Sequence, residues 1–248
     1  DAERLWSSIM ASAEIGKGSR GGLRRLALGD ADREMRELFR RWVTGDGYNV
    51  KVDRLGSMFV RREGREPNLP PVLIGSHLDT QAAGGRFDGI LGVLGGLEVL
   101  RTLDQAGIKT RRPIEVVNWT NEEGARFLPP MMASLAFAGK ETPEWVLARV
   151  DKDGATVGAE LQRIGFAGPE PVGGRAIDAY FELHIEQGPR LDAAKVPIGI
   201  VVGGFPTRGM RIEIRGETAH VGPTPMTRRR NALVGAAHVA VAIDEIGW

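Results

Sequence analysis

Three short groups of histidine and carboxylate residues are the parts of this sequence that could do chemistry at a metal ion. They are His77-Leu78-Asp79, Glu122-Glu123, and His184 within the stretch Phe181–Glu186. Imidazole nitrogen and carboxylate oxygen are ligands that suit zinc, manganese or cobalt. The chain contains no cysteine, which excludes a thiolate metal site, a disulfide framework and a cysteine nucleophile.

The spacing within these groups favours hydrolysis. Residues two apart on an extended segment point the same way, so the Asp79 carboxylate could hold the His77 imidazole and fix its tautomer. Adjacent side chains at a strand end diverge, so one of Glu122 and Glu123 could bind a metal while the other takes a proton from a metal-activated water. Each group taken alone also fits a solvated loop or a structural histidine.

Further residues are candidates for the same site. Asp88, in a glycine-rich stretch, could bridge two cations or simply cap a helix. Gln187 lies near enough to His184 to address a polar substrate group. His220, in a loop rich in Gly and Pro, could donate to a developing oxyanion. His238 lies among alanines and valines on a predicted helix, where a packing or surface role is favoured.

Alternating strand and helix patterns must position these residues. The apolar runs 72–74 and 114–119 predict strands that are buried on both faces, and each runs directly into polar residues. Further strands are predicted at 48–52, 57–62, 181–186, 198–202 and 210–215, and helices at 3–10, 30–44 with Asp30 as its cap, 90–103 and 230–246. Strands separated by helices indicate an α/β sandwich, in which ligands gather at the carboxyl ends of the strands. We therefore expect His77, Glu122-Glu123 and His184 to meet at one edge of a sheet.

Composition limits the classes of molecule that the protein is expected to bind. The 33 basic and 32 acidic residues give a net charge of +1 with no sustained run of either sign, which argues against a nucleic-acid or membrane-surface role. No apolar run of about 18 residues occurs, and the N-terminus does not resemble a secretory signal, so a cytoplasmic location is expected. Glycine-rich nucleotide-binding motifs and the G-x-S-x-G elbow are also missing.

Four motifs together resemble the M20 metallopeptidase superfamily: Gly75–Thr80, Gly84–Gly89, Asn118–Phe127 and Glu182–Pro189. More narrowly, they are similar to its branch of N-carbamoyl-L-amino-acid hydrolases, allantoate amidohydrolases and β-ureidopropionases. The resemblance covers nearly the whole chain in the right order. It implies an α/β, three-layer sandwich catalytic domain with a central mixed sheet over residues 1–206. From residue 207 it implies the first part of an α+β, ferredoxin-like lid and dimerisation domain.

The resemblance also implies two divalent metal ions, zinc, manganese or cobalt, as cofactors. His77 and Glu123 would be terminal ligands of different metals. Asp88 would bridge both ions, and His184 would complete the protein ligands of the first metal.

The remaining roles follow from the same resemblance. Glu122 would be the general base, and Asp79 would orient His77. Gln187, Arg208 and His220 would contact the substrate, with His220 reaching over from the partner subunit of a homodimer. No nucleic acid or membrane partner is implied.

The expected reaction is hydrolysis of the linear C–N bond of an N-carbamoyl-L-amino acid or a related ureido compound. Allantoate and N-carbamoyl-β-alanine are the nearest alternative substrates, and an aminoacylase or dipeptidase activity is more distant. Thr207, Pro223 and Asn231 stand where the branch often carries glutamine, threonine and aspartate, departures that bear on substrate preference.

The sequence lacks the last histidine ligand of the family, and the lid asparagine and arginine that grip the substrate carboxylate. We therefore expect the natural chain to continue past Trp248. If it ends there, the alternative is a catalytically incompetent metal-binding or interaction protein.

Overall fold

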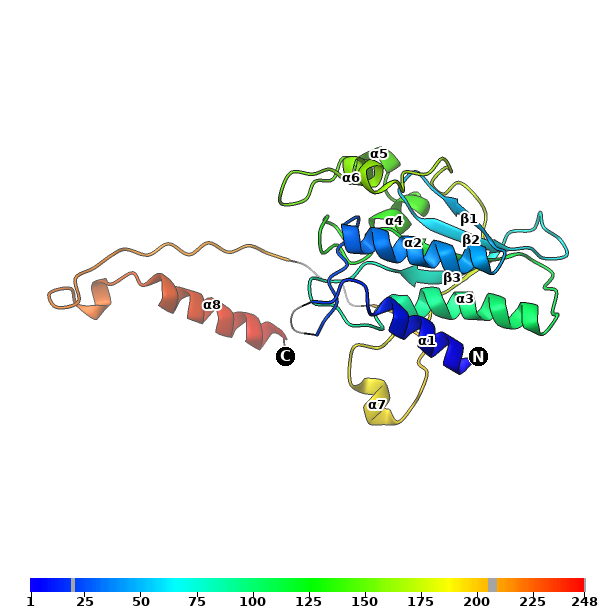
Figure 1. The fold of residues 1–248 in the computed structure, drawn as a ribbon. Helices are drawn as coiled ribbons and strands as arrows, with labels where there is room; N and C mark the ends of the chain where they lie inside the picture. The colour runs from blue at the N-terminus through cyan, green and yellow to red at the C-terminus, as the bar shows by residue number, and fades with distance from the viewer. Residues whose placement is uncertain (19–20, 205–208, 248) are drawn as a thin grey trace. The chain divides into compact units, whose positions relative to one another are not determined.

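The computed structural model describes residues 1–18, 21–204 and 209–247 (Figure 1). The chain divides into two compact units, Asp1–Pro189 and Arg190–Trp248. The domain boundary expected between residues 206 and 207 lies outside the described residues, as do Thr207 and the expected substrate contact Arg208. The boundary and the Arg208 contact therefore stay predictions.

A five-stranded mixed sheet forms the centre of the first unit. Its strands are β1 (Asn49–Val52), β2 (Met58–Arg62), β3 (Val72–His77), β4 (Ile114–Trp119) and β5 (Ala179–Phe181), in the order β1-β2-β4-β3-β5. β3 runs parallel to both β4 and β5, whereas β2 runs antiparallel to β1 and β4. The predicted α/β class with a central mixed sheet is confirmed.

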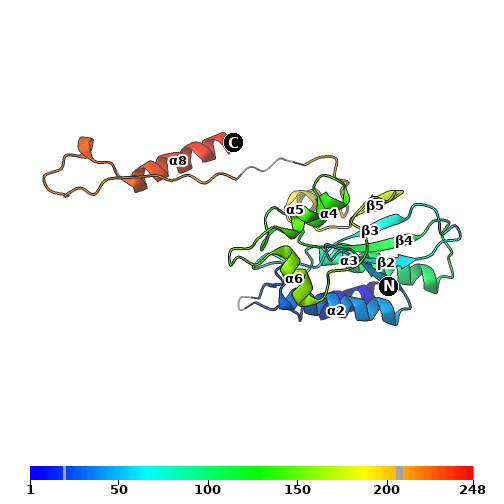
Figure 2. The same cartoon turned by 90° about the horizontal axis from the view of Figure 1, so that it is seen from above.

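The long helices of the first unit are α1 (Ala2–Ser12), α2 (Asp30–Gly45) and α3 (Ile90–Gln105), and the short ones are α4 (Met132–Phe137), α5 (Pro143–Leu147) and α6 (Val157–Ile164). Figure 2 shows α2 and α4 on opposite sides of the sheet. The larger core packs α2 and α3 against one face, and a smaller cluster centred on Phe59, Val117 and Trp119 packs against Phe137 of α4. None of the helices described is long and apolar enough to cross a membrane.

Close approach of α3 to the sheet depends on a missing side chain. A Cβ atom at Gly96 would lie 3.1 Å from side-chain carbons of both Ile74 and Val116. The strands of these two residues are the parallel pair β3 and β4. Because α3 can pack directly on this pair, the loop that precedes the helix comes to the carboxyl end of β3.

Several predicted elements differ from the structure. Residues 198–202 and 210–215 form no strand, because no described segment pairs with them, and a strand needs a neighbour for its main-chain groups. The strand predicted at 181–186 ends at Phe181. Asp30 is the first residue of α2, and Gly29 is its cap. The second unit contains α7 (Arg190–Ala194), a 3₁₀ turn η1 (Met226–Arg228) and α8 (Ala232–Gly247), which confirms the last predicted helix.

An arginine of a buried ion pair within α2 also links this helix to the carboxyl end of β4. The Arg36 Nε donates to Asp32 Oδ2 at 2.9 Å, and both side chains are fully buried. The same guanidinium donates to the Gly56 carbonyl at 2.7 Å and to Thr120 Oγ1 at 3.2 Å. Arg36 therefore connects the helix with the first residue after β4.

We expect the substitution Arg36→Met to lower the free energy of unfolding by about 3–5 kcal/mol, because it leaves the Asp32 charge buried without its partner. Urea unfolding followed by circular dichroism measures the loss. Arg33→Met is the matched control on α2, since Arg33 pairs with Glu37 at the surface, and its effect should stay within about 0.5 kcal/mol. Equal losses in the two variants would show that the buried pair adds nothing.

Candidate metal centre

Three segments that are far apart in the sequence bring ligand atoms together at the carboxyl end of β3. His77 is the last residue of β3, Asp88 lies just before α3, and His184 follows β5. One ligand atom from each of these residues lies within 4.8 Å of the other two. His77 and Asp88 are buried, whereas His184 is exposed, with 31% of its side chain accessible. The structure thus brings together three of the four residues expected to bind metal.

Main-chain contacts set the tautomer of both imidazoles. The Nδ1 atom of His77 lies 2.8 Å from the carbonyl oxygen of Asp79, and that of His184 lies 2.8 Å from the carbonyl oxygen of Ile185. Because a carbonyl oxygen only accepts, each Nδ1 carries a hydrogen, so that in the neutral ring each Nε2 carries the lone pair.

These Nε2 lone pairs face carboxylates. His77 Nε2 lies 3.3 Å from Glu122 Oε2, and His184 Nε2 lies 3.2 Å from Asp88 Oδ1. A lone pair against a carboxylate oxygen is unfavourable unless a proton or a metal cation lies between them. The donor set and its geometry therefore fit a divalent metal ion.

Gly89 provides the space in which the His77 ring lies. Its φ is +66°, and a Cβ atom at this position would lie 2.4–2.5 Å from three atoms of the His77 imidazole. Any larger residue at the start of α3 would be strained and would collide with the ring.

The carboxylate of Asp79 binds the turn after β4. Its Oδ1 accepts the N–H of Glu122 and its Oδ2 accepts the N–H of Glu123, each at 3.3 Å. The carboxylate lies 3.8 Å from His77 Nδ1, so the expected orienting contact is made by the main-chain oxygen of Asp79 instead. Burial raises the pKa of Asp79 to about 7, against the opposing effect of His77.

Glu122 and Glu123 have different partners, as adjacent side chains at a strand end should. Glu122 faces His77, and burial raises its pKa against the attraction of His77. Burial lowers the pKa of His77, but the charges of Asp79 and Glu122 outweigh this effect and raise it. Glu123 instead binds Gln81, accepting from its main-chain N–H at 3.1 Å and from its Nε2 at 2.7 Å. Its predicted role as a metal ligand is not tested by this contact.

Two residues that sequence reasoning missed support this arrangement. Gln81 holds Glu123, and no sequence signal marks it. Asn121 has a φ of +54°, and its Nδ2 donates to the Phe127 carbonyl at 2.9 Å, so it turns the chain directly before Glu122. Asparagine tolerates this left-handed conformation better than most residues, which is a signal that could have been used.

Gln187 and His220, which are expected to contact the substrate, have other partners in the structure. Gln187 donates from Nε2 to Asp88 Oδ2 at 2.7 Å, so it binds a predicted metal ligand. His220 belongs to the second unit, where its Nδ1 accepts the N–H of Gly222 at 3.1 Å. Contact of Gln187 or His220 with substrate stays a prediction. His238 is exposed on α8, which agrees with a surface role.

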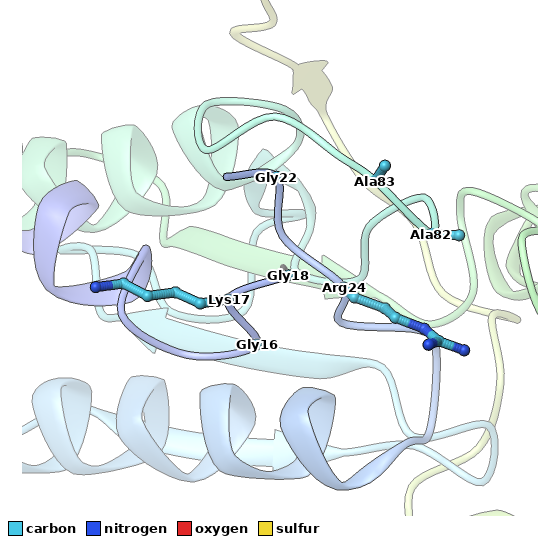
Figure 3. A pocket seen from close by; sticks show the side chains of 7 residues that line it. All are labelled: Gly16, Lys17, Gly18, Gly22, Arg24, Ala82 and Ala83. Atoms are coloured by element: carbon cyan, nitrogen blue, oxygen red, sulfur yellow. The ribbon is translucent and has the colours of Figure 1, made fainter. Parts of the chain in front are cut away.

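A hollow of about 450 Å³ lies beside the loop that follows β3 (Figure 3). Its lining consists of Gly16, Lys17, Gly18, Gly22, Arg24, Ala82 and Ala83. Figure 3 shows the Lys17 and Arg24 side chains pointing in opposite directions. The two cations do not converge on a common ligand, and no predicted metal ligand lines this hollow.

Known proteins resemble the chain closely. It is 50% identical over 246 residues to the N-carbamoyl-L-amino-acid amidohydrolase of Rhizobium meliloti, a match that covers 99% of this chain and 59% of that protein. It is 40% identical over 247 residues to the N-carbamoyl-L-amino acid amidohydrolase of Geobacillus stearothermophilus, covering 98% and 60%. The chain therefore spans about three fifths of the length of these relatives.

A solved structure agrees with these relatives. The crystal structure of an amidase of the hydantoinase/carbamoylase family from Burkholderia multivorans has a TM-score of 0.85 to this chain and 51% sequence identity, covering 100% of this chain and 60% of that one. The sequence model of peptidase family M20/M25/M40 matches residues 73–246, which include all the candidate metal ligands. The chain belongs to peptidase family M20/M25/M40.

Proposed function

We propose that this chain carries the metal-binding part of an amidohydrolase that cleaves the linear C–N bond of an N-carbamoyl-L-amino acid. The observation that carries the proposal is the convergence of His77, Asp88 and His184, with their ligand atoms within 4.8 Å of one another. The names of the relatives and the membership in the M20 family support the substrate class.

The residues of this chain would hold two divalent ions, with zinc, manganese and cobalt as the candidates. His77 and His184 would offer nitrogen ligands, and Asp88 would offer a carboxylate to the ions. Glu123 would have to exchange its contacts with Gln81 for a metal. A bound divalent ion supplies Lewis acidity, which polarises the ureido carbonyl and makes the attacking water more acidic.

Glu122 would move the proton. Its Oε2 atom lies beside the predicted ligand His77, and 30% of its side chain is exposed, so it can reach both the centre and an incoming substrate. Glu122 Oε2 would take the proton of the attacking water and deliver it to the nitrogen that leaves. Substrate contacts by Gln187, Arg208 and His220, a homodimer and a cytoplasmic location are further parts of the proposal.

We expect Glu122→Gln to lower kcat by about 10²–10⁴-fold, because the amide cannot accept the proton. Metal binding should be retained, because the predicted ligands are intact. Glu37→Gln, on the exposed side of α2, is the control. Turnover of N-carbamoyl-L-amino acids, allantoate and N-carbamoyl-β-alanine is measured with manganese, cobalt and zinc.

That assay uses the 248-residue chain and, if the reading frame extends past Trp248, the longer product as well. Full turnover by Glu122→Gln would remove Glu122 from the mechanism. Failure of the unaltered protein to bind any of the three metals would overturn the proposed function itself.

Gly89→Ala should weaken metal binding by about 10- to 100-fold, because the added Cβ would take the space of the His77 ring. Gly85→Ala is the matched control in the same loop, since nothing lies within 4 Å of a Cβ atom at Gly85. Isothermal titration with Zn²⁺ or Mn²⁺ measures both variants, and circular dichroism checks that each is folded. If the two variants bind alike, the fit of His77 against Gly89 does not matter for metal binding.

A further inference from the structure

Arg25 is fully buried, and among the described residues the hydrogen bonds of its guanidinium go only to main-chain oxygens. Its Nε donates to the Leu78 carbonyl at 3.1 Å. Its Nη1 donates to the carbonyls of Ser12 at 2.8 Å and Ile15 at 3.3 Å, and its Nη2 has no hydrogen-bond partner in residues 1–18, 21–204 and 209–247. Within the part of the chain that the structure describes, no carboxylate lies within ion-pair distance of Arg25. The buried Arg36, by contrast, pairs directly with Asp32.

Such a burial is costly. A guanidinium that leaves water and finds neither a carboxylate nor a full set of acceptors loses more solvation than it regains. Burial accordingly lowers the pKa of Arg25 to about 10, and the more distant charges of Asp32 and Asp79 oppose this effect only in part. An apolar side chain of similar volume would fill the same space at lower cost. The position of Arg25 therefore calls for a role other than packing.

Arg25 forms hydrogen bonds to the segment Leu78–Thr80, which includes Asp79 and therefore the contacts that orient His77. Its side chain binds the carbonyl of Leu78, which lies between His77 and Asp79. Its main-chain N–H donates to Thr80 Oγ1 at 2.9 Å, and its carbonyl accepts the N–H of Thr80 at 2.8 Å. The chain is thus fastened on both sides of Asp79.

Because Asp79 is held in place, the groups that it contacts at the site are held in place as well. Its main-chain oxygen accepts the Nδ1–H of His77, and its carboxylate accepts the N–H groups of Glu122 and Glu123. A small shift of Asp79 would turn the His77 ring and move the general base at the same time.

We propose that Arg25 is a positioning residue of the metal centre, which holds Leu78–Thr80 so that Asp79 keeps His77 Nε2 presented as a ligand. This inference rests on the proposed function, because it assigns Arg25 to the same centre. The competing explanation is structural: through Ser12 and Ile15, Arg25 would only attach the end of α1 to the sheet. The two explanations differ in what happens to metal affinity.

The experiment compares Arg25→Lys and Arg25→Met with Arg62→Lys in the 248-residue chain. Arg62 is a buried arginine and the last residue of β2, beside the first residue of β4 and therefore away from the carboxyl end of β4, and it pairs with Asp104 at 2.7 Å. Zn²⁺ and Mn²⁺ affinities are measured by isothermal titration, and thermal unfolding records stability. Nitrogen-15 NMR of the histidine rings reports which nitrogen of His77 carries the hydrogen, without any metal.

We expect Arg25→Lys to weaken metal binding by about tenfold and Arg25→Met by more, because the hydrogen bond from the Arg25 side chain to the Leu78 carbonyl is weakened in the first variant and lost in the second. Arg62→Lys should bind metal within about twofold of the unaltered chain, even if it is equally destabilised. The His77 ring should change from one tautomer, with hydrogen on Nδ1, to a mixture in both Arg25 variants.

Unchanged metal affinity and an unchanged His77 tautomer in Arg25→Lys would overturn the inference and leave the structural explanation. If neither Arg25 variant folds, Thr80→Val decides, since it removes the acceptor of the Arg25 main-chain N–H while keeping the size of the side chain. Thr80→Val should then weaken metal binding severalfold, and wild-type affinity would overturn the inference. If the unaltered chain binds no metal, the proposed function fails, and the tautomer of His77 still tests Arg25.

Discussion

The hydrogen bonds of the Asp79 carboxylate to the N–H groups of Glu122 and Glu123 join two strand ends into one site. Asp79 follows β3, and the two glutamates follow β4, its parallel neighbour. Parallel strands bring their carboxyl ends to the same edge of a sheet, but they do not fix how the loops beyond them meet. In this protein the loops after β3 and β4 are held together by the buried Asp79 carboxylate, because each of its oxygens accepts a main-chain N–H from the second loop. The relation of His77 to Glu122 depends on that contact.

Much of this arrangement could be predicted from the sequence, because local patterns determine it. The apolar runs that became β3 and β4 were recognisable, and both led directly into polar residues. The topological rule for α/β sheets then placed His77 and Glu122 at one edge. Asp88, which also fitted an ordinary helix cap, was included only through the family resemblance.

Other features escaped prediction because they depend on contacts between distant segments. Alternating apolar residues describe the two faces of a strand, but they do not supply the neighbour that residues 198–202 and 210–215 would need. Arginines are read from sequence as surface residues, yet Arg25 and Arg36 are fully buried around the site. The helices α5 and α6 were missed although Thr142 and Thr156 cap them, since both are too short for a helical period to stand out.

The backbone around the centre has one further property. Gly89, Asn121 and Gln187 all have positive φ angles, of +66°, +54° and +55°, and each lies within three residues of a predicted metal ligand or of the general base. The backbone around the site is thus shaped by positive φ angles that most amino acids avoid. Its outline and its chemistry are therefore separable: an engineer could exchange the metal-binding side chains for others while leaving these three bends alone. Exchanging the bends themselves would collapse the outline whatever ligands were chosen.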